Sequence, residues 1–114
     1  MLEKDNAIVL LMLEAIDKIF RYTNDLNTEI EFENDIESFD ATMMNFIVIG
    51  ECVSKLSDNF KDLNPQIDWR KVLSFRNVLA HDYFGILAEE VWEIIKKHLP
   101  MLKSSLKKNC KNKL

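Results

Sequence analysis

Three side chains that suit chemistry on phosphate esters lie within eight residues of one another. They are Arg76, His81 and Tyr83, spaced as an arginine, four residues, a histidine, one residue and a tyrosine. Arginine offers a permanent charge and forked donors for phosphate oxygens, and a histidine imidazole exchanges protons near neutral pH. With a phenol beside them, these groups suit metal-free cleavage of a phosphodiester. A helix can carry the same residue types for other reasons, so the surrounding elements must decide.

Those elements are expected to be helices, because only two glycines and two prolines interrupt 114 residues of which 47% are hydrophobic. Asp5 or Asn6 is expected to cap the first helix and Asp68 the third. Pro100 is expected to kink or restart the fourth helix. The predicted helices span about 5–22, from 35 or 38 to 56, 69 to about 81, and 87 to about 108.

An acidic connector, 29–37, and a loop, 59–67, are expected between these helices, with cap-like Asn34 and Asp35 near the end of the first connector. Gly50 lies inside the second helix, where close approach of another helix would justify a residue that costs about 1 kcal/mol relative to alanine. The fold class that follows is all-α, a four-helix antiparallel bundle forming a single domain over 1–114.

The composition argues against a disulfide-rich, zinc-binding, secreted or membrane-spanning protein. Cys52 and Cys110 are too few for a disulfide framework or a zinc site, and Cys52 reads as a small core residue. We expect no metal and no cofactor. The sequence shows no signal peptide, and its longest apolar run, Ala7 to Leu13, is too short to span a bilayer. We therefore expect a cytoplasmic protein without a membrane segment.

The net charge of −4 is unevenly distributed. Residues 1–95 contain 8 Lys/Arg and 19 Asp/Glu, whereas 96–114 contain seven lysines and no acid. This lysine-rich segment has three interpretations: contact with RNA phosphates, contact with an acidic partner, or simple complementation of a helix dipole in solvent.

Helical geometry gives Arg76 an unusual position. At about 100° per residue, it lies in the middle of the apolar arc of the third helix, while Asn77 and His81 lie on a neighbouring polar stripe. The arc contains Trp69, Val72, Leu73, Leu79 and Ala80, and the stripe also contains Arg70 and Ser74. A guanidinium on such an arc needs a partner. Either an interior acid, for which Glu51 is the obvious candidate, pairs with Arg76, or the arc faces a cleft or a subunit interface that contains an anion.

The same geometry separates the motif. Residues five apart on one helix point roughly 140° away from each other, so Arg76 and His81 cannot easily face one phosphate from a straight helix. The helix could end near His81 and let the imidazole and Tyr83 turn back. Alternatively, two subunits could present their motifs to a shared groove.

These residues are part of a longer pattern that resembles the HepT-like family of HEPN domains. The order and spacing match from about residue 6 to 106, and the family hallmark R-x(4)-H-x-Y corresponds to Arg76, His81 and Tyr83. The matching segments are 45–51, 55–57, 68–70, 76–85, 91–92 and 99–100.

The resemblance implies a dimeric bundle with both motifs in a shared cleft, and a metal-independent endoribonuclease that is the toxin of a type VII toxin–antitoxin pair. It also implies a partner, an MNT-type nucleotidyltransferase that neutralises the toxin by adenylylating Tyr83. On this interpretation Arg76 and His81 are catalytic, and Asn77, Tyr83, Glu51 and Arg70 bind substrate or support the site.

Two other interpretations stay open. The chain could be a non-catalytic helical module that binds a nucleotidyltransferase and helps present its substrate. It could also be a degenerate dimer that retains only the fold, which the intact Arg76, His81 and Tyr83 disfavour.

Overall fold

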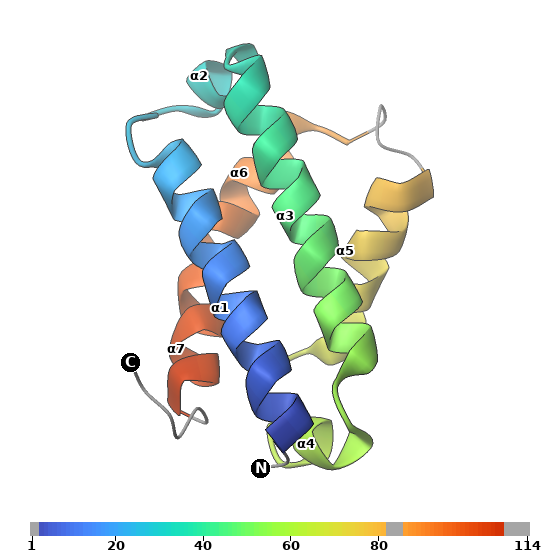
Figure 1. Ribbon diagram of the computed structural model, residues 1–114. Coiled ribbons are helices and arrows are strands. Elements are labelled where there is room, and N and C mark those ends of the chain that lie inside the picture. Colours follow the sequence, from blue (N-terminus) through green and yellow to red (C-terminus); the bar gives the residue numbers. More distant parts are fainter. Residues whose placement is uncertain (1–2, 82–85, 109–114) are drawn as a thin grey trace.

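The computed structural model describes residues 3–81 and 86–108, and every regular element in that part of the chain is helical (Figure 1). The expected all-α bundle is confirmed. Four long rods correspond to the four predicted helices, the last of them built from α6, a π-helical segment η2, and α7. The elements are α1 (Glu3–Thr23), α2 (Glu29–Asn34), α3 (Ile36–Lys55), α4 (Asp58–Asp62), α5 (Trp69–His81), α6 (Ala88–Glu93), η2 (Ile94–His98) and α7 (Leu99–Lys108).

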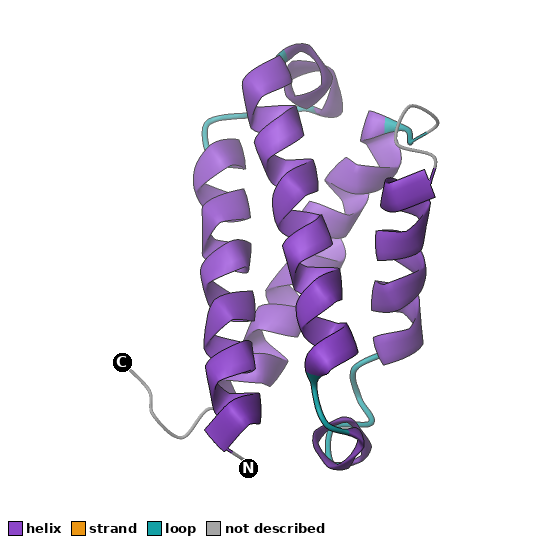
Figure 2. Cartoon of the chain, turned by 45° about the vertical axis from the view of Figure 1, so that its right-hand side comes forward, coloured by secondary structure: helices purple, strands orange, loops and turns teal. Residues whose placement is uncertain are grey.

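Helices α1, α3 and α5 lie side by side in alternating directions, and the α6–η2–α7 rod crosses behind them (Figures 1 and 2). Helix α3 is central, because it packs against both α1 and α5. Within the rod, α7 contacts α1 and α6 contacts α2. The short helices α2 and α4 lie at opposite ends of the molecule (Figure 1).

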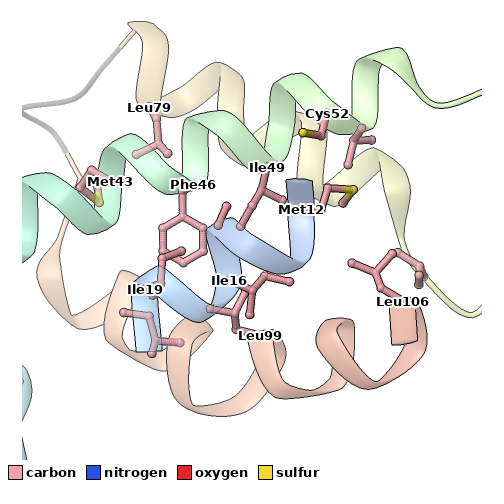
Figure 3. Close-up of a cluster of buried hydrophobic side chains, with 14 of the residues drawn as sticks. Met12, Ile16, Ile19, Met43, Phe46, Ile49, Cys52, Leu79, Leu99 and Leu106 are labelled. Atoms are coloured by element: carbon pink, nitrogen blue, oxygen red, sulfur yellow. The ribbon is translucent and has the colours of Figure 1, made fainter. Parts of the chain in front are cut away.

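The core lies between the three-helix layer and the crossing rod (Figure 3). Its residues recur on one side of each long helix, as burial of an amphipathic face requires. Cys52 is buried among them, as the sequence predicted. Fully buried side chains include Met12, Ile16, Ile19, Met43, Leu79, Ile95 and Leu106.

The predicted caps at Asp5 or Asn6 are wrong. Helix α1 is already formed at Glu3, and Asp5 is inside it with only 1% of its surface exposed. The Asp5 carboxylate accepts hydrogen bonds from the Ser57 backbone N–H, at 2.9 Å, and from the Ser57 hydroxyl, at 2.6 Å. Asp5 therefore joins α1 to the start of another helix, a contact between residues 52 positions apart in sequence.

That other helix is α4, which replaces the first half of the loop expected at 59–67. Ser57 is its N-cap, and the Ser57 hydroxyl accepts from the Phe60 N–H at 3.1 Å. Phe60 is buried against Trp69, with ring centroids 6.1 Å apart. Helix α4 has five residues, too short for a periodic pattern, so the cap and the buried ring stabilise it instead.

The acidic connector also contains a helix that the hydrophobic periodicity of the sequence did not predict. Helix α2 begins after Thr28, whose hydroxyl accepts from the Glu31 N–H at 3.2 Å. Phe32 is fully buried and packs between the rings of Phe39 and Trp92, at centroid distances of 5.1 and 5.5 Å. One buried aromatic side chain thus fixes α2 against α3 and α6.

The other two predicted caps are confirmed. Asp35 accepts from the Ser38 N–H at 3.1 Å at the start of α3, and Asp68 accepts from the Lys71 N–H at 3.1 Å at the start of α5. Both acids satisfy backbone donors that no residue of their own helix can reach.

The irregularity expected near Pro100 takes the form of a π-helical turn. The Leu99 N–H donates to the Ile94 carbonyl, five residues earlier. Pro100 has no N–H to donate, so the regular i to i−4 ladder cannot continue through it. The rod remains continuous, with its wide turn immediately before the proline.

Candidate functional site

At Gly50, the backbone of α3 lies against the Arg76 side chain of α5. A Cβ atom added to Gly50 would overlap Cβ and Cγ of Arg76. The glycine therefore allows the backbone of α3 to lie directly against the Arg76 side chain. This confirms the sequence-based expectation that close approach of another helix explains Gly50.

Arg76 pairs with Glu51, the neighbour of that glycine. The Arg76 Nη1 atom donates to Glu51 Oε1 at 2.5 Å. The Arg76 side chain is 25% exposed, so its stem is packed between the helices and its terminal nitrogens are near the surface. Of the two alternatives for a guanidinium on the apolar arc, pairing with Glu51 is the one that the structure adopts.

Glu51 differs from the expectation in one respect, because it is not an interior acid. Its side chain is 49% exposed. Glu51 lies at the edge of the α3–α5 contact, where its carboxylate keeps access to water while it meets Arg76. This position avoids the large desolvation cost that a fully buried ion pair would incur.

The pair leaves part of the Arg76 donor set unused. One Glu51 oxygen contacts one terminal nitrogen, and Arg76 Nε is buried without a hydrogen-bond partner in the described structure. A guanidinium has five N–H donors. A phosphate that met Arg76 would therefore use the exposed terminal nitrogens rather than Nε.

The polar stripe predicted on α5 is present at the surface. Arg70, Asn77 and His81 are all exposed, as expected for residues on the side of α5 that faces away from the core. His81 is the last described residue of α5, and Tyr83 lies outside the described residues. The site that the structure assembles is therefore Arg76 with Glu51, with Asn77 and His81 displayed on an adjoining surface.

Three lysines of the fourth rod contact nearby side chains. Lys96 lies over the Trp92 ring at 4.5 Å, Lys97 pairs with Glu93 at 3.4 Å, and Lys103 pairs with Asp17 at 2.7 Å. Lys96 and Lys97 thus contact side chains of their own rod, whereas Lys103 joins the rod to α1. The last lysines, Lys111 and Lys113, lie outside the described residues.

The described residues contain no group of three or more His, Cys, Asp or Glu side chains arranged to hold a metal ion. Within 3–81 and 86–108, no helix is long and apolar enough to cross a membrane.

The structure defines the chain as an all-helical bundle, and comparison with known proteins identifies its family. A family model described as "Ribonuclease HepT-like" matches residues 12–108. The chain belongs to this HepT-like ribonuclease family.

Curated relatives have names that agree with this family. The chain is 33% identical over 95 residues to a "probable ribonuclease HepT" of Thermococcus cleftensis, covering 83% of this chain and 86% of that protein. It is 35% identical over 89 residues to a "putative RNase" of Methanocaldococcus jannaschii, covering 78% and 73% of the two chains. No solved structure gives a significant match.

Proposed function

We propose that this chain is a metal-independent endoribonuclease and the toxin of a type VII toxin–antitoxin pair. The observation that supports the proposal is the Arg76–Glu51 pair at the α3–α5 contact, which holds the Arg76 guanidinium on the same helix that displays the exposed Asn77 and His81 on its adjoining surface. Membership of the HepT-like ribonuclease family supports RNA as the substrate.

RNA supplies its own nucleophile, so the protein needs only proton transfer and charge stabilisation. The 2′-oxygen attacks the neighbouring phosphorus and the bond to the 5′-oxygen breaks. His81 takes the proton from the 2′-hydroxyl or delivers one to the departing 5′-oxygen. Arg76 donates hydrogen bonds to the phosphate oxygens, where negative charge grows in the transition state. Asn77 orients the imidazole or binds phosphate, and Arg70 lies on the same stripe to meet the RNA backbone.

The complete site in this proposal is formed by a homodimer. Met44 and Val48 are large apolar residues exposed on α3, and they precede Glu51 on one helical stripe. Exposed apolar residues in such a row suit contact with a second subunit. A second copy placed there would bring its own Arg76 and His81 to the same cleft, which overcomes the angular separation within one helix.

The proposed antitoxin is an MNT-type nucleotidyltransferase that adenylylates Tyr83. An AMP group would add bulk and negative charge to a surface that must receive RNA. The reaction transfers AMP from ATP to the tyrosine oxygen and releases pyrophosphate. Intact-mass measurement after co-expression with a neighbouring nucleotidyltransferase gene tests this part: no gain in steps of AMP, or a gain retained by Tyr83→Phe, would refute it.

The ribonuclease proposal is tested by incubating purified variants with RNA in the presence of EDTA. Wild type should cleave RNA, whereas Arg76→Ala and His81→Ala should lose at least about a hundredfold in rate. His98→Ala is the matched control, because His98 is also an exposed histidine but lies on η2. Equal activity of His81→Ala and wild type would refute the catalytic assignment. In that case a non-catalytic module that binds a nucleotidyltransferase becomes the better interpretation.

Glu51 is a positioning residue in this scheme, because it touches Arg76 and not the reacting atoms. Glu51→Gln keeps an oxygen that accepts from Arg76, whereas Glu51→Ala keeps none. We therefore expect Glu51→Gln to retain more activity than Glu51→Ala while both remain folded. Equal losses in the two variants would show that the hydrogen bond to Arg76 does not position the site.

A further inference from the structure

A hollow of about 600 Å³ lies where α4 leads into α5, at the opposite end of α5 from His81. Residues of α4, of the connector after it and of the first turns of α5 line this hollow. They include Lys61, Pro65, Trp69, Arg70 and Leu73. Neither Arg76 nor Glu51 is among them, so the hollow is separate from the pair at the α3–α5 contact. Its volume is within the range of small-molecule sites, about 300–1,000 Å³.

Trp69 is held in a fixed orientation beside this hollow. Its indole N–H donates to the carbonyl oxygens of Lys61 and Asn64, at 3.2 Å each, and its ring centroid lies 6.1 Å from that of Phe60. The Trp69 side chain is nevertheless only half-buried, and it lines the hollow together with Pro65. The hollow therefore offers a positioned aromatic side chain with apolar neighbours, which is the kind of surface on which an unpaired base stacks.

Two cations line the same hollow, Lys61 from α4 and Arg70 from α5. Neither forms an ion pair within the part of the chain that the structure describes. Among the described residues of the lining, Asp68 is the one acid, and it already accepts from the Lys71 N–H as the cap of α5. Even when the whole charge of Asp68 is subtracted from that of Lys61 and Arg70, one positive charge remains.

Helix stability does not explain the charge of Arg70. Arg70 lies in the first turn of α5, and that turn contains no acid. The helix dipole favours acids at this end and disfavours cations. A cation kept there without an ion-pair partner is better explained by an anion that binds to it.

The charge distribution favours an RNA strand that runs from His81 toward this hollow. Residues 22–54 contain eight Asp/Glu and no Lys/Arg, and seven of those acids lie in 25–40, at the α2 end of the bundle (Figure 1). Helix α5 contains no acid, and residues 55–71 contain four Lys/Arg and three Asp/Glu. A polyanion bound at His81 is therefore repelled from the α2 end and not from the length of α5.

A polar stripe joins the two ends of this path. Arg70, Ser74, Asn77 and His81 are exposed and recur every three or four residues, so they follow one side of α5. Arg70 and His81 are 11 positions apart, which is about 16 Å along a helix. A stacked strand advances about 3.4 Å per nucleotide, so about five nucleotides span this distance.

We propose that the hollow binds one nucleotide of the RNA strand, about five nucleotides from the phosphodiester that is cleaved. The base stacks on Trp69, and Arg70 and Lys61 donate hydrogen bonds to its phosphate. The base must be unpaired to do so, which makes single-stranded RNA the substrate. This inference rests on the proposed function, because it requires RNA at His81.

The test is cleavage, in EDTA, of a nested set of synthetic RNAs by the full chain. The set is made by shortening, one nucleotide at a time from either end, an oligonucleotide that wild type cuts at one position. We expect kcat/KM of wild type to fall at least about tenfold when shortening removes the nucleotide held in the hollow. Arg70→Ala should cleave the full-length RNA at least about tenfold more slowly than wild type and should show no such step. An equal loss in Arg70→Ala at every RNA length would overturn the proposal.

Lys71→Ala is the matched control. Lys71 is the exposed cation next to Arg70 in the same turn, but it does not line the hollow. Lys71→Ala should keep the length dependence of wild type, whereas Lys61→Ala should lose it in part. The same loss of length dependence in Lys71→Ala and Arg70→Ala would show a general effect of charge and would overturn the site.

Binding measured without cleavage gives a second readout. In the His81→Ala background, the slope of log Kd against log salt for the full-length RNA should fall by about 0.7 when Arg70→Ala is added. An unchanged slope would show that Arg70 contacts no phosphate. Removing a cation from the first turn of a helix does not weaken that helix, so unfolding does not account for a loss in Arg70→Ala.

The failures of the two proposals differ. If wild type cleaves no RNA of any length, the ribonuclease proposal fails and this inference fails with it. If wild type cleaves RNA but the effects of RNA length and of Arg70→Ala are independent, only the nucleotide site is refuted and the ribonuclease proposal stands.

Discussion

Replacing Gly50 by alanine sets two opposing effects against each other at the motif. In a free helix, glycine to alanine is favourable by about 1 kcal/mol. Here the new methyl group would overlap Cβ and Cγ of Arg76. The Arg76 Cβ is fixed to its backbone and cannot rotate away, so α5 must move from α3.

Overpacking of this kind costs typically about 1–3 kcal/mol, and the overlap with a fixed atom places this case near the upper end. After the gain in helix propensity, we expect Gly50→Ala to lower the free energy of unfolding by about 2 kcal/mol. Urea denaturation followed by tryptophan fluorescence measures this directly. The melting temperature should fall by about 8 °C, since 1 kcal/mol corresponds to about 4 °C in a chain of this size.

A double-mutant cycle with Arg76→Ala shows whether the overlap is the cause. Arg76→Ala removes Cγ but keeps Cβ, so Gly50→Ala should cost less in that background without becoming stabilising. A stabilisation of about 1 kcal/mol by Gly50→Ala in the wild-type background would refute the reasoning. It would mean that α3 and α5 are not in contact at this point.

Two further substitutions and one reactivity measurement test the contacts and burial that complete the fold. Asp5→Ala should lower the free energy of unfolding by about 3 kcal/mol, because it removes a buried carboxylate that accepts hydrogen bonds from the Ser57 N–H and hydroxyl. A decrease no larger than that caused by replacing an exposed aspartate with alanine would contradict this. Phe32→Ala should cost about 3–5 kcal/mol by leaving a cavity between two aromatic rings, and a cost near that of an exposed phenylalanine would show that α2 does not close the core. Burial raises the pKa of the Cys52 thiol, while nearby Lys55 lowers it and Glu51 raises it by smaller amounts. In a Cys110→Ser background, an aromatic disulfide reagent should therefore react far more slowly with the native protein than with the protein in denaturant. Similar rates in both conditions would show that Cys52 is accessible.

Much of the fold followed from local signals in the sequence. The four long rods, the caps at Asp35 and Asp68 and the irregularity before Pro100 were all predicted, because periodicity and capping depend on residues within one or two turns of each other. The short helices α2 and α4 were not. Each has too few residues for a period, and each is stabilised by a buried ring, Phe32 or Phe60, whose partners lie elsewhere in the chain.

The site divides in the same way. The sequence by itself determined that Arg76 lies on the apolar side of α5 and that Asn77 and His81 share a separate polar stripe, because a helix turns by a fixed angle per residue. It also determined that Gly50 marks a close helix approach, because a glycine inside a helix is costly unless another helix needs the space. Only the tertiary structure decided that Glu51 pairs with Arg76 from an exposed position, and that α5 stays uncovered beside η2 and α7. Those features depend on which surfaces of distant helices meet, and helical periodicity contains no information about that choice.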